Sequence, residues 1–494
     1  MTRKDMEYIY EKQKELIILE RIDSLLTWDK HTTMPKNGFR TRSEAESLIE
    51  TISHKLLVSN GLYDSVRRLR KANLSKEEKA MVDKLYRRIL KSRKLPEEFV
   101  GKMSKETSLA YGAWVEARKK SDFEIFKPHL ERIVKLKIKE ASYIGIKGHP
   151  YNSLLDHFEE GMTVERLIPV FAKLKVDLLD LSAKVESSEV YKNKKIRYIK
   201  LNFDRDKQMK VCRDVSRRIG IDEDFSRIGV SEHPFTAKMG IDDVRFTINF
   251  HDNVMHAFSS TIHEVGHTLY DLNTPKNYTV LSDAPSFGIH ESQSRFWENM
   301  IGKSRSFWKY YLKKFRKEFR INPKLDEFLI EVNDVHNGLI RIESDELYYC
   351  LHIILRFEIE LGLIDGKIKV KDLPKIWNEK MREITGKYPK NNAEGVLQDV
   401  HWSSGYFGYF PTYAIGTIYA AQIFNSLKKK YPDIEDDITA GDYTKIREWL
   451  IKNIHSKGSL YLAEEIIRQC CGEGLNPEAY IEYLTTKYRE IYKF

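Results

Sequence analysis

The five residues from His263 to His267 constrain this chain more than any other stretch, because they read His-Glu-Val-Gly-His. Residues four apart lie on the same side of an α-helix, so a helix lets both imidazoles bind one ion at roughly 2.0–2.1 Å. Glu264 is turned by about 100° from its neighbour and can reach a water on that ion without binding it. Apolar residues continue at helical spacing on both sides, and Asp252 or Asn253 is the expected N-cap. The stretch predicts a buried helix with two metal ligands and a general base.

A third ligand is expected at Glu291, which lies 24 residues beyond His267, far enough for one loop and the start of a second helix. Two imidazoles and one carboxylate leave a fourth position open for water, as in catalytic zinc sites. Two other ligand sets do not fit. The metzincin pattern requires Gly and His where this chain has Tyr270 and Asn273, and the four Cys show no paired C-x-x-C spacing.

The low content of glycine and proline favours a mostly helical chain. Only 25 Gly and 14 Pro occur in 494 residues, and no linker rich in Pro, Gly or Ser divides them, so a single domain is expected over 1–494. Apolar residues at three- and four-residue spacing indicate the helical parts of this domain. Alternating β-branched and aromatic residues around Gly240 indicate a small sheet. The expected parts are a helical lobe at about 1–220, a small antiparallel sheet at about 226–250, metal-site helices at about 253–300 and a C-terminal helical lobe at about 305–494.

Charge and hydropathy argue against nucleic acid and membrane as partners. The formal net charge is +10, from 83 basic and 73 acidic residues interspersed along the chain, which is typical of a charged, solvated surface. No uncharged apolar run approaches the roughly 18 residues that span a bilayer, and the N-terminus lacks the apolar core of a signal peptide. Four Cys in no disulfide-like arrangement then predict a cytoplasmic protein. Six Gln beside many Lys, Glu and Ile point to thermostability.

Further motifs, in order and spacing, resemble those of one known family, the M32 metallocarboxypeptidases typified by carboxypeptidase Taq. The resemblance covers nearly the whole chain. The matching elements are His233-Pro-Phe235, Asp243-Val-Arg-Phe-Thr247, His263-Glu-Val-Gly-His267, His290-Glu-Ser-Gln293, Gly395-Val-Leu-Gln-Asp-Val-His-Trp402 and Gly408-Tyr-Phe-Pro-Thr-Tyr413.

The resemblance implies an almost all-helical, saddle-shaped domain with a long central groove, similar to neurolysin or angiotensin-converting enzyme, and a homodimer. It also implies that C-terminal residues are removed, with broad specificity, from peptides with a free C-terminus. One divalent metal ion per chain is expected. The ligand set suits zinc, and cobalt is the alternative.

In the mechanism that follows, His263, His267 and Glu291 bind the ion, which activates a water molecule and polarises the scissile carbonyl. Glu264 takes the proton of the water and passes it to the leaving amine. Asp271, one turn beyond His267, either orients a ligand imidazole or is simply solvated.

The transition-state oxyanion requires hydrogen-bond donors that face the ion. His401, Tyr409 and Tyr413 are the candidates, because they lie in or beside a loop punctuated by glycine and rich in aromatic residues. The alternative is that these side chains only pack in the core, which is the commoner fate of a tyrosine.

A carboxypeptidase must also bind the free α-carboxylate of its substrate, and the planar fork of an arginine does so through two parallel hydrogen bonds. Arg245, in the predicted strand before the metal helix, and Arg356 are the candidates, although either could form an ordinary ion pair. His233 is expected to bind substrate and not the ion, with a hydrogen-bonded structural role as the alternative.

Two rival functions remain open. An oligopeptidase or endopeptidase of the same helical group would share the ligands and Glu264 but lack a carboxylate anchor. A catalytically silent scaffold or nucleic-acid binder would retain the metal site without activity. The intact set of ligands and base argues against this second alternative.

Overall fold

The computed structural model describes residues 2–250 and 253–494, which are mostly helical with one small three-stranded sheet. This confirms the predicted mainly α fold class. The chain divides into two compact units. Met1–Arg93, Ile196–Val332 and Gln422–Gly474 form the first unit, and Lys94–Lys195, Asn333–Ala421 and Leu475–Phe494 form the second. Each unit combines segments from both halves of the sequence, so the units do not follow the predicted lobes, and the single domain stays a prediction.

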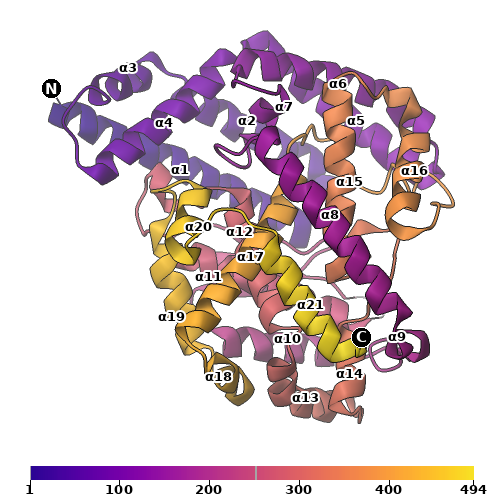
Figure 1. Cartoon of the computed structure of the whole chain (residues 1–494). Coiled ribbons are helices and arrows are strands. Elements are labelled where there is room, and N and C mark those ends of the chain that lie inside the picture. The colour runs from indigo at the N-terminus through magenta and orange to yellow at the C-terminus, as the bar shows by residue number, and fades with distance from the viewer. Residues whose placement is uncertain (1, 251–252) are drawn as a thin grey trace. The chain divides into compact units, whose positions relative to one another are not determined.

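The first unit holds the N-terminal helices, the sheet and the helices of the predicted metal site. Its helices are α1 (Thr2–Thr32), α2 (Phe39–Leu57), α3 (Asn60–Leu69), α4 (Lys76–Lys94), α10 (Arg205–Ile219), α11 (Val254–Asn273), α12 (Phe287–Arg295), α13 (Arg305–Phe319), α14 (Leu325–Val332), α18 (Ile434–Ala440), α19 (Thr444–Asn453) and α20 (Ala463–Cys471). The helices α1, α11 and α12 are labelled in Figure 1. The shorter turns are η1 (Lys36–Gly38), η2 (Val280–Ser282), η6 (His455–Lys457) and η3 (Phe296–Ile301), which is a π-helical continuation of α12.

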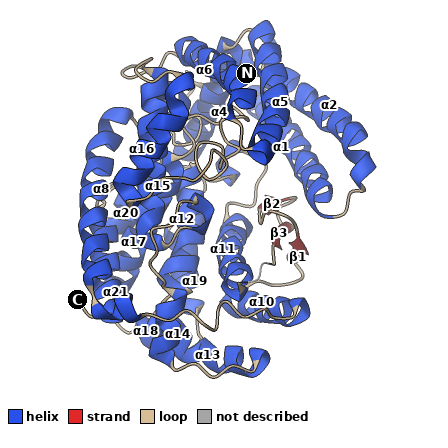
Figure 2. Ribbon diagram, turned by 90° about the vertical axis from the view of Figure 1, so that its right-hand side faces the viewer, coloured by secondary structure: helices blue, strands red, loops and turns tan. Residues whose placement is uncertain are grey.

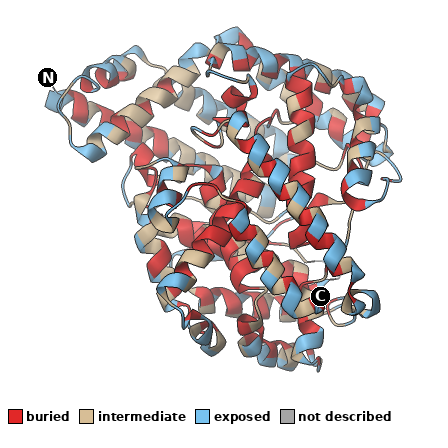
Figure 3. Ribbon diagram, viewed as in Figure 1, coloured by how far each residue is buried: buried red, intermediate tan, exposed pale blue. Residues whose placement is uncertain are grey.

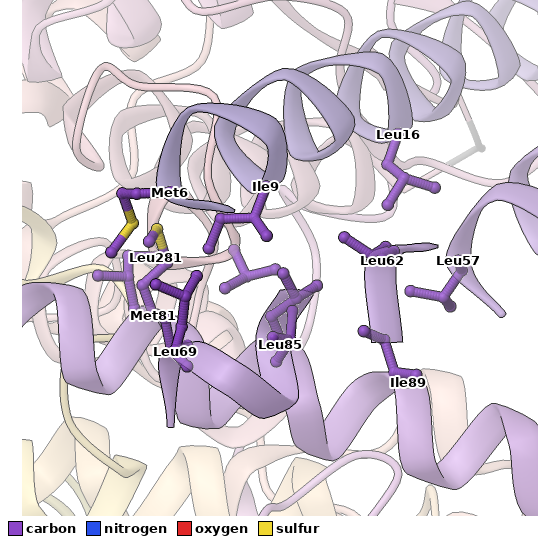
Figure 4. Packing of buried hydrophobic residues seen from close by; sticks show 13 residues of the cluster. Met6, Ile9, Leu16, Leu57, Leu62, Leu69, Met81, Leu85, Ile89 and Leu281 are labelled. Atoms are coloured by element: carbon purple, nitrogen blue, oxygen red, sulfur yellow. The ribbon is translucent and has the colours of Figure 1, made fainter. Parts of the chain in front are cut away.

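A buried hydrophobic cluster joins the N-terminal helices of this unit (Figure 4). Ile9 of α1, Leu62 of α3 and Leu85 of α4 belong to it, because each helix repeats apolar residues at three- and four-residue spacing. Val280 of η2 joins the same cluster, and its N–H donates to the side-chain oxygen of Gln13 at 3.0 Å. These contacts anchor the segment that leads into α12.

The sheet is mixed, with the strand order β1-β3-β2. β1 (Ser226–Val230) runs parallel to β3 (Val244–Ile248), whereas β2 (Thr236–Lys238) pairs with β3 in the antiparallel direction. The predicted antiparallel sheet is therefore correct for β2 and wrong for β1. Alternation in the sequence indicates which face of a strand is buried, but it carries no information on strand direction. Figure 2 shows the sheet beside α11, against which β2 and β3 pack.

The two helices of the predicted metal site each begin at a capping side chain. The side chain of Asn253 accepts a hydrogen bond from the N–H of Met255 at 2.8 Å at the start of α11. The alternative cap, Asp252, lies outside the described residues. Ser286 caps α12 by accepting from the N–H of Ile289 at 3.1 Å. Each capping side chain accepts from a backbone N–H that has no partner within its helix, and this determines where the helix starts.

The second unit contains no strand within the described residues, and its regular elements are all helices. Its elements are α5 (Glu97–Lys120), α6 (Phe123–Ile144), α7 (Tyr151–Leu155), α8 (Val164–Ser187), α9 (Glu189–Asn193), η4 (Arg341–Glu343), α15 (Glu346–Ile364), η5 (Val370–Asp372), α16 (Leu373–Thr385) and α21 (Glu478–Tyr492), and α17 (Pro411–Lys430) begins here and ends in the first unit. The almost wholly buried α15 contacts α6, α8 and α16 (Figure 3). Across the described parts of both units, no helix is both long and apolar enough to cross a membrane.

Candidate metal centre

Three side chains of the first unit meet at one point: His263 and His267 from α11, and Glu291 from α12. The Nε2 atoms of His263 and His267 lie 3.7 Å and 3.5 Å from Oε2 of Glu291. One ligand atom from each residue lies within 4.8 Å of the other two, a spacing that could hold one metal ion. The structure therefore brings the predicted ligand set together.

The close approach of α11 and α12 depends on Gly266, which lies between the two histidines. A Cβ atom at this position would lie 2.5 Å from the backbone oxygen of Gln293 and 2.7 Å from Cα of Ser294. Both of those residues belong to α12, two and three residues after Glu291 and so within one turn of it. Only the absence of a side chain lets the two backbones pack this closely and bring Glu291 to the histidines.

Two residues missed by the sequence reasoning complete the centre. Nδ1 of His263 lies 2.8 Å from a carboxylate oxygen of Glu298 in η3, which fixes the ring and leaves Nε2 for an ion. Arg295 donates to Glu291 at 2.7 Å and to Glu298 at 3.4 Å. Glu291, Arg295 and Glu298 follow one another at spacings of four and three, which is the signal that could have revealed them.

The charges of the centre keep its carboxylates ionised despite burial. Burial raises the pKa of Glu291, but Arg295 and His263 outweigh it and hold that pKa well below its usual range. Burial also raises the pKa of Glu298, but Arg295 outweighs burial and lowers that pKa to about 2. Burial lowers the pKa of His267 to about 4, whereas Glu291 and Glu298 overcome burial and raise the pKa of His263. Ionised carboxylates and neutral imidazoles are the forms that bind metal, so among the three ligands only the pKa of His263 is shifted against metal binding.

The predicted base, Glu264, is buried on the same helix as the two histidines. Its Oε2 accepts a hydrogen bond from Oγ1 of Thr236 in β2 at 2.6 Å. Burial raises the pKa of Glu264 above its ordinary value, although His263 and Thr236 act in the opposite direction. A carboxylate with a raised pKa is a stronger proton acceptor, so the environment suits general-base chemistry.

Asp271 contacts the centre indirectly. Its carboxylate lies 3.2 Å from Nε2 of His290, and the ring of His290 stacks on that of His267 with 4.4 Å between centroids. Burial opposes ionisation, but His290 lowers the pKa of Asp271 to about 2. Asp271 is therefore neither a solvated surface residue nor a direct partner of a ligand imidazole, because His290 stands between them.

The two remaining candidates of the first unit lie in and before the sheet. His233 is exposed, and its backbone oxygen accepts from the hydroxyl of Ser231 at 2.6 Å. Arg245 of β3 forms two hydrogen bonds with the carboxylate of Asp243, at 2.8 Å and 2.7 Å. The guanidinium already has a carboxylate partner, although 29% of the side chain remains exposed.

In the second unit, the structure brings together His401, Tyr409 and Tyr413. Nε2 of His401 lies 3.2 Å from the hydroxyl of Tyr413. The ring centroid of Tyr409 lies 5.4 Å from that of His401 and 5.3 Å from that of Tyr413. Burial, together with Arg341, lowers the pKa of His401 to about 3, so its imidazole is neutral.

Arg356 is fully buried in the second unit and forms part of an ion-pair network. Its guanidinium donates to Asp399 at 2.7 Å and to Gln398 at 2.8 Å. Arg341 donates to the other oxygen of Asp399 at 2.9 Å, which the sequence reasoning did not anticipate. Because the Arg356 side chain has no exposed surface, this arrangement favours a structural role in holding the segment before His401.

Two histidines four apart on a buried helix, a glutamate after the first and a third ligand from the next helix define a metal-dependent peptidase centre. The chain belongs to the carboxypeptidase Taq (M32) metallopeptidase family, whose model matches residues 8–488. It is therefore a metal-dependent carboxypeptidase and a peptide hydrolase.

Similarity to known members extends over almost the whole chain. Thermostable carboxypeptidase 1 of Pyrococcus furiosus is 35% identical over 491 residues, which cover 98% of this chain and 98% of that protein. Carboxypeptidase 1 of Bacillus subtilis is 36% identical over 500 residues, which cover 98% of this chain and 99% of that protein. The crystal structure of the M32 carboxypeptidase from Deinococcus radiodurans R1 superposes with a TM-score of 0.96 at 32% identity, over 99% of this chain and 100% of that one.

Proposed function

We propose that His263, His267 and Glu291 bind one divalent ion and that Glu264 is the general base of peptide hydrolysis. The observation that carries this proposal is the meeting of three ligand atoms within 4.8 Å beside the buried carboxylate of Glu264. When bound, such an ion supplies Lewis-acid polarisation of the scissile carbonyl and increases the acidity of a water molecule. Glu264 takes the proton of the attacking water and passes it to the leaving amine.

Zinc is the proposed ion, with cobalt as the alternative. Two imidazoles and one carboxylate are a common zinc ligand set, and the same nitrogen and oxygen donors also suit cobalt. An imidazole must be neutral to act as a ligand, so the raised pKa of His263 makes protonation compete with the ion more strongly there than at His267. Elemental analysis of the purified protein identifies the ion and its stoichiometry.

The proposed substrates are peptides with a free C-terminus, cleaved with broad side-chain specificity. The carboxypeptidase names of the relatives support this substrate class. For the α-carboxylate, Arg245 remains the better candidate, because it keeps exposed surface whereas Arg356 does not. The exposed His233 remains a candidate for substrate binding. The cluster of His401, Tyr409 and Tyr413 stays a candidate donor group for the oxyanion.

The test compares hydrolysis of one peptide as its free acid and as its C-terminal amide. We expect release of the C-terminal residue from the acid and little turnover of the amide, because the amide lacks the charge that an anchor binds. The Glu264→Gln variant should bind metal with unchanged stoichiometry and lose activity by about 100-fold or more, since its amide cannot accept the proton. Equal rates on acid and amide would instead support an endopeptidase or oligopeptidase.

A homodimer, a cytoplasmic location and thermostability also remain proposals. They rest on the family resemblance and on composition. Sedimentation equilibrium tests the homodimer, and a thermal inactivation series tests thermostability.

A further inference from the structure

The hydroxyl of Thr236 makes a short contact with the carboxylate of the proposed base. Its Oγ1 lies 2.6 Å from Oε2 of Glu264 and 3.3 Å from the backbone oxygen of the same residue. An ionised carboxylate only accepts hydrogen bonds, so the hydroxyl is the donor. Among residues 2–250 and 253–494, Thr236 is the sole hydrogen-bond donor to this carboxylate.

Thr236 is held by the sheet independently of this contact. It stands opposite the buried Phe246 in the antiparallel pairing of β2 with β3. The preceding residue, Phe235, donates its N–H to Oγ1 of Thr247 at 3.1 Å and accepts from the N–H of Thr247 at 2.9 Å. The ring of Phe235 also packs edge-on against Trp28 of α1, with 5.7 Å between centroids. These contacts fix the position of the Thr236 hydroxyl without any contribution from Glu264.

We propose that Thr236 is a positioning residue for the general base. By holding Oε2 of Glu264, the hydroxyl fixes the rotamer of the side chain and leaves Oε1 to take the proton of the attacking water. A hydrogen bond to an ionised group is stronger than one between neutral groups, and a buried carboxylate without this donor would adopt other rotamers. This inference rests on the proposed role of Glu264.

A purely structural role is the alternative, because the same hydroxyl also ties β2 to α11. The two roles predict different effects on turnover. A positioning role requires a hydroxyl at position 236 and acts through Glu264. A structural role would be fulfilled by any side chain of similar shape, such as valine, and would be independent of Glu264.

The experiment compares Thr236→Val, Thr236→Ser and the control Thr261→Val. Thr261 is a buried threonine of α11 whose hydroxyl donates to the backbone oxygen of Ala257 and not to Glu264. We expect Thr236→Val to lower kcat by about 10- to 100-fold with KM changed less than about twofold, as for other residues that orient a reacting group. Thr236→Ser and Thr261→Val should stay within about threefold of the parent in kcat. Metal affinity, measured by chelator competition, should be unchanged in every variant.

A double-mutant cycle with Glu264→Gln separates this inference from the proposed function. If Thr236 acts through Glu264, adding Thr236→Val to Glu264→Gln should cause no further loss of kcat. The same loss in both backgrounds, or equal losses in the Val and Ser variants, would overturn the positioning role while Glu264 remained the base. Full activity of Glu264→Gln alone would overturn the proposed function itself. If Thr236→Val does not fold, the pair Thr236→Ala and Thr236→Ser makes the same comparison.

Discussion

At the scale of single residues, the metal centre depends on charged side chains that are not ligands themselves. Arg295 lies between the carboxylates of Glu291 and Glu298 and offsets their mutual repulsion, which lets both stay ionised in a buried position. Glu298 in turn orients His263 through Nδ1. The ligands can therefore be arranged for an ion before any ion binds.

Replacing Glu298 by Gln should weaken metal binding about 10- to 100-fold, the range typical of partners of ligand imidazoles. The amide can still accept a hydrogen bond from Nδ1 of His263, but it lacks the negative charge that favours metal binding at Nε2. A competition titration with a chromophoric chelator measures the dissociation constant. The control is Glu318→Gln, which removes a carboxylate of α13 that pairs with Lys210 and should leave the affinity unchanged. Equal affinities for parent and Glu298→Gln would contradict this role.

Sequence spacing was sufficient to predict the site residues that share one helix. It was insufficient to predict the residues that contact them from other elements. His263, Glu264 and His267 were identified because their separation has a fixed geometric meaning on a helix. Thr236 lies 28 residues before Glu264, and Glu298 lies 35 residues after His263. The contact of Thr236 depends on how β2 packs against α11, which no local pattern encodes, whereas Glu298 could have been suspected only from its spacing to Glu291 and Arg295 and not from any relation to His263.

At the scale of elements, Gly266 determines how closely α11 and α12 can pack. Gly266→Ala should lower the free energy of unfolding by about 1–3 kcal/mol, because the new methyl group would overlap the backbone of Gln293 and Ser294. This cost exceeds the gain of about 0.5–1 kcal/mol that alanine normally brings to a helix. The displacement of α12 should also weaken metal binding through Glu291. Chemical denaturation and the chelator titration measure the two effects.

The matched control is Gly112→Ala in the middle of α5. A Cβ atom at Gly112 would have no neighbour within 4 Å, and the residue is exposed. This variant should be more stable than the parent by about 0.5–1 kcal/mol, since only the backbone entropy of the unfolded chain changes. A destabilising effect of the same size at both glycines would contradict the packing explanation.

The sheet shows where prediction of the elements was incomplete. Alternating β-branched and aromatic residues placed the strands at 226–230, 236–238 and 244–248 within the expected range, although β3 is buried at all of its residues except Arg245. The parallel pairing of Ser226 with Val244 was missed, since it depends on the path that the chain takes through β2. That path matters for function, because it places Thr236 at the edge of the sheet beside α11.

At the scale of the whole molecule, the chain crosses repeatedly between its two units. Each unit is assembled from three segments, which helical periodicity cannot reveal because it describes each helix by itself. The motifs outside the metal site predicted the family, and the family match over residues 8–488 confirms it. Neither periodicity nor family motifs predicted that a buried carboxylate, Glu360, would join separate segments of the second unit.

Glu360 of α15 accepts three hydrogen bonds from two other parts of that unit. The donors are the hydroxyl of Tyr151 at 2.5 Å, Nε1 of Trp402 at 2.8 Å and the N–H of Gly408 at 3.0 Å. Gly408 has a φ of +89°, and a Cβ there would lie 2.7 Å from the backbone of α7, so this loop has little freedom to move. Burial raises the pKa of Glu360 to about 7, although the three donors oppose the shift.

The stability of the protein should therefore depend on pH through Glu360. The folded chain holds this proton more tightly than the unfolded chain, so the contribution is fully present below pH 4.5 and is lost as pH rises through about 7. At about 1.4 kcal/mol per pKa unit, the loss amounts to about 3 kcal/mol. Glu360→Gln does not titrate, so its Tm relative to the parent should rise between pH 4.5 and 8 when both are measured by calorimetry without metal. Glu379→Gln, on the exposed side of α16, should follow the parent at every pH. A difference between Glu360→Gln and the parent that stays constant with pH would show that Glu360 is ionised throughout.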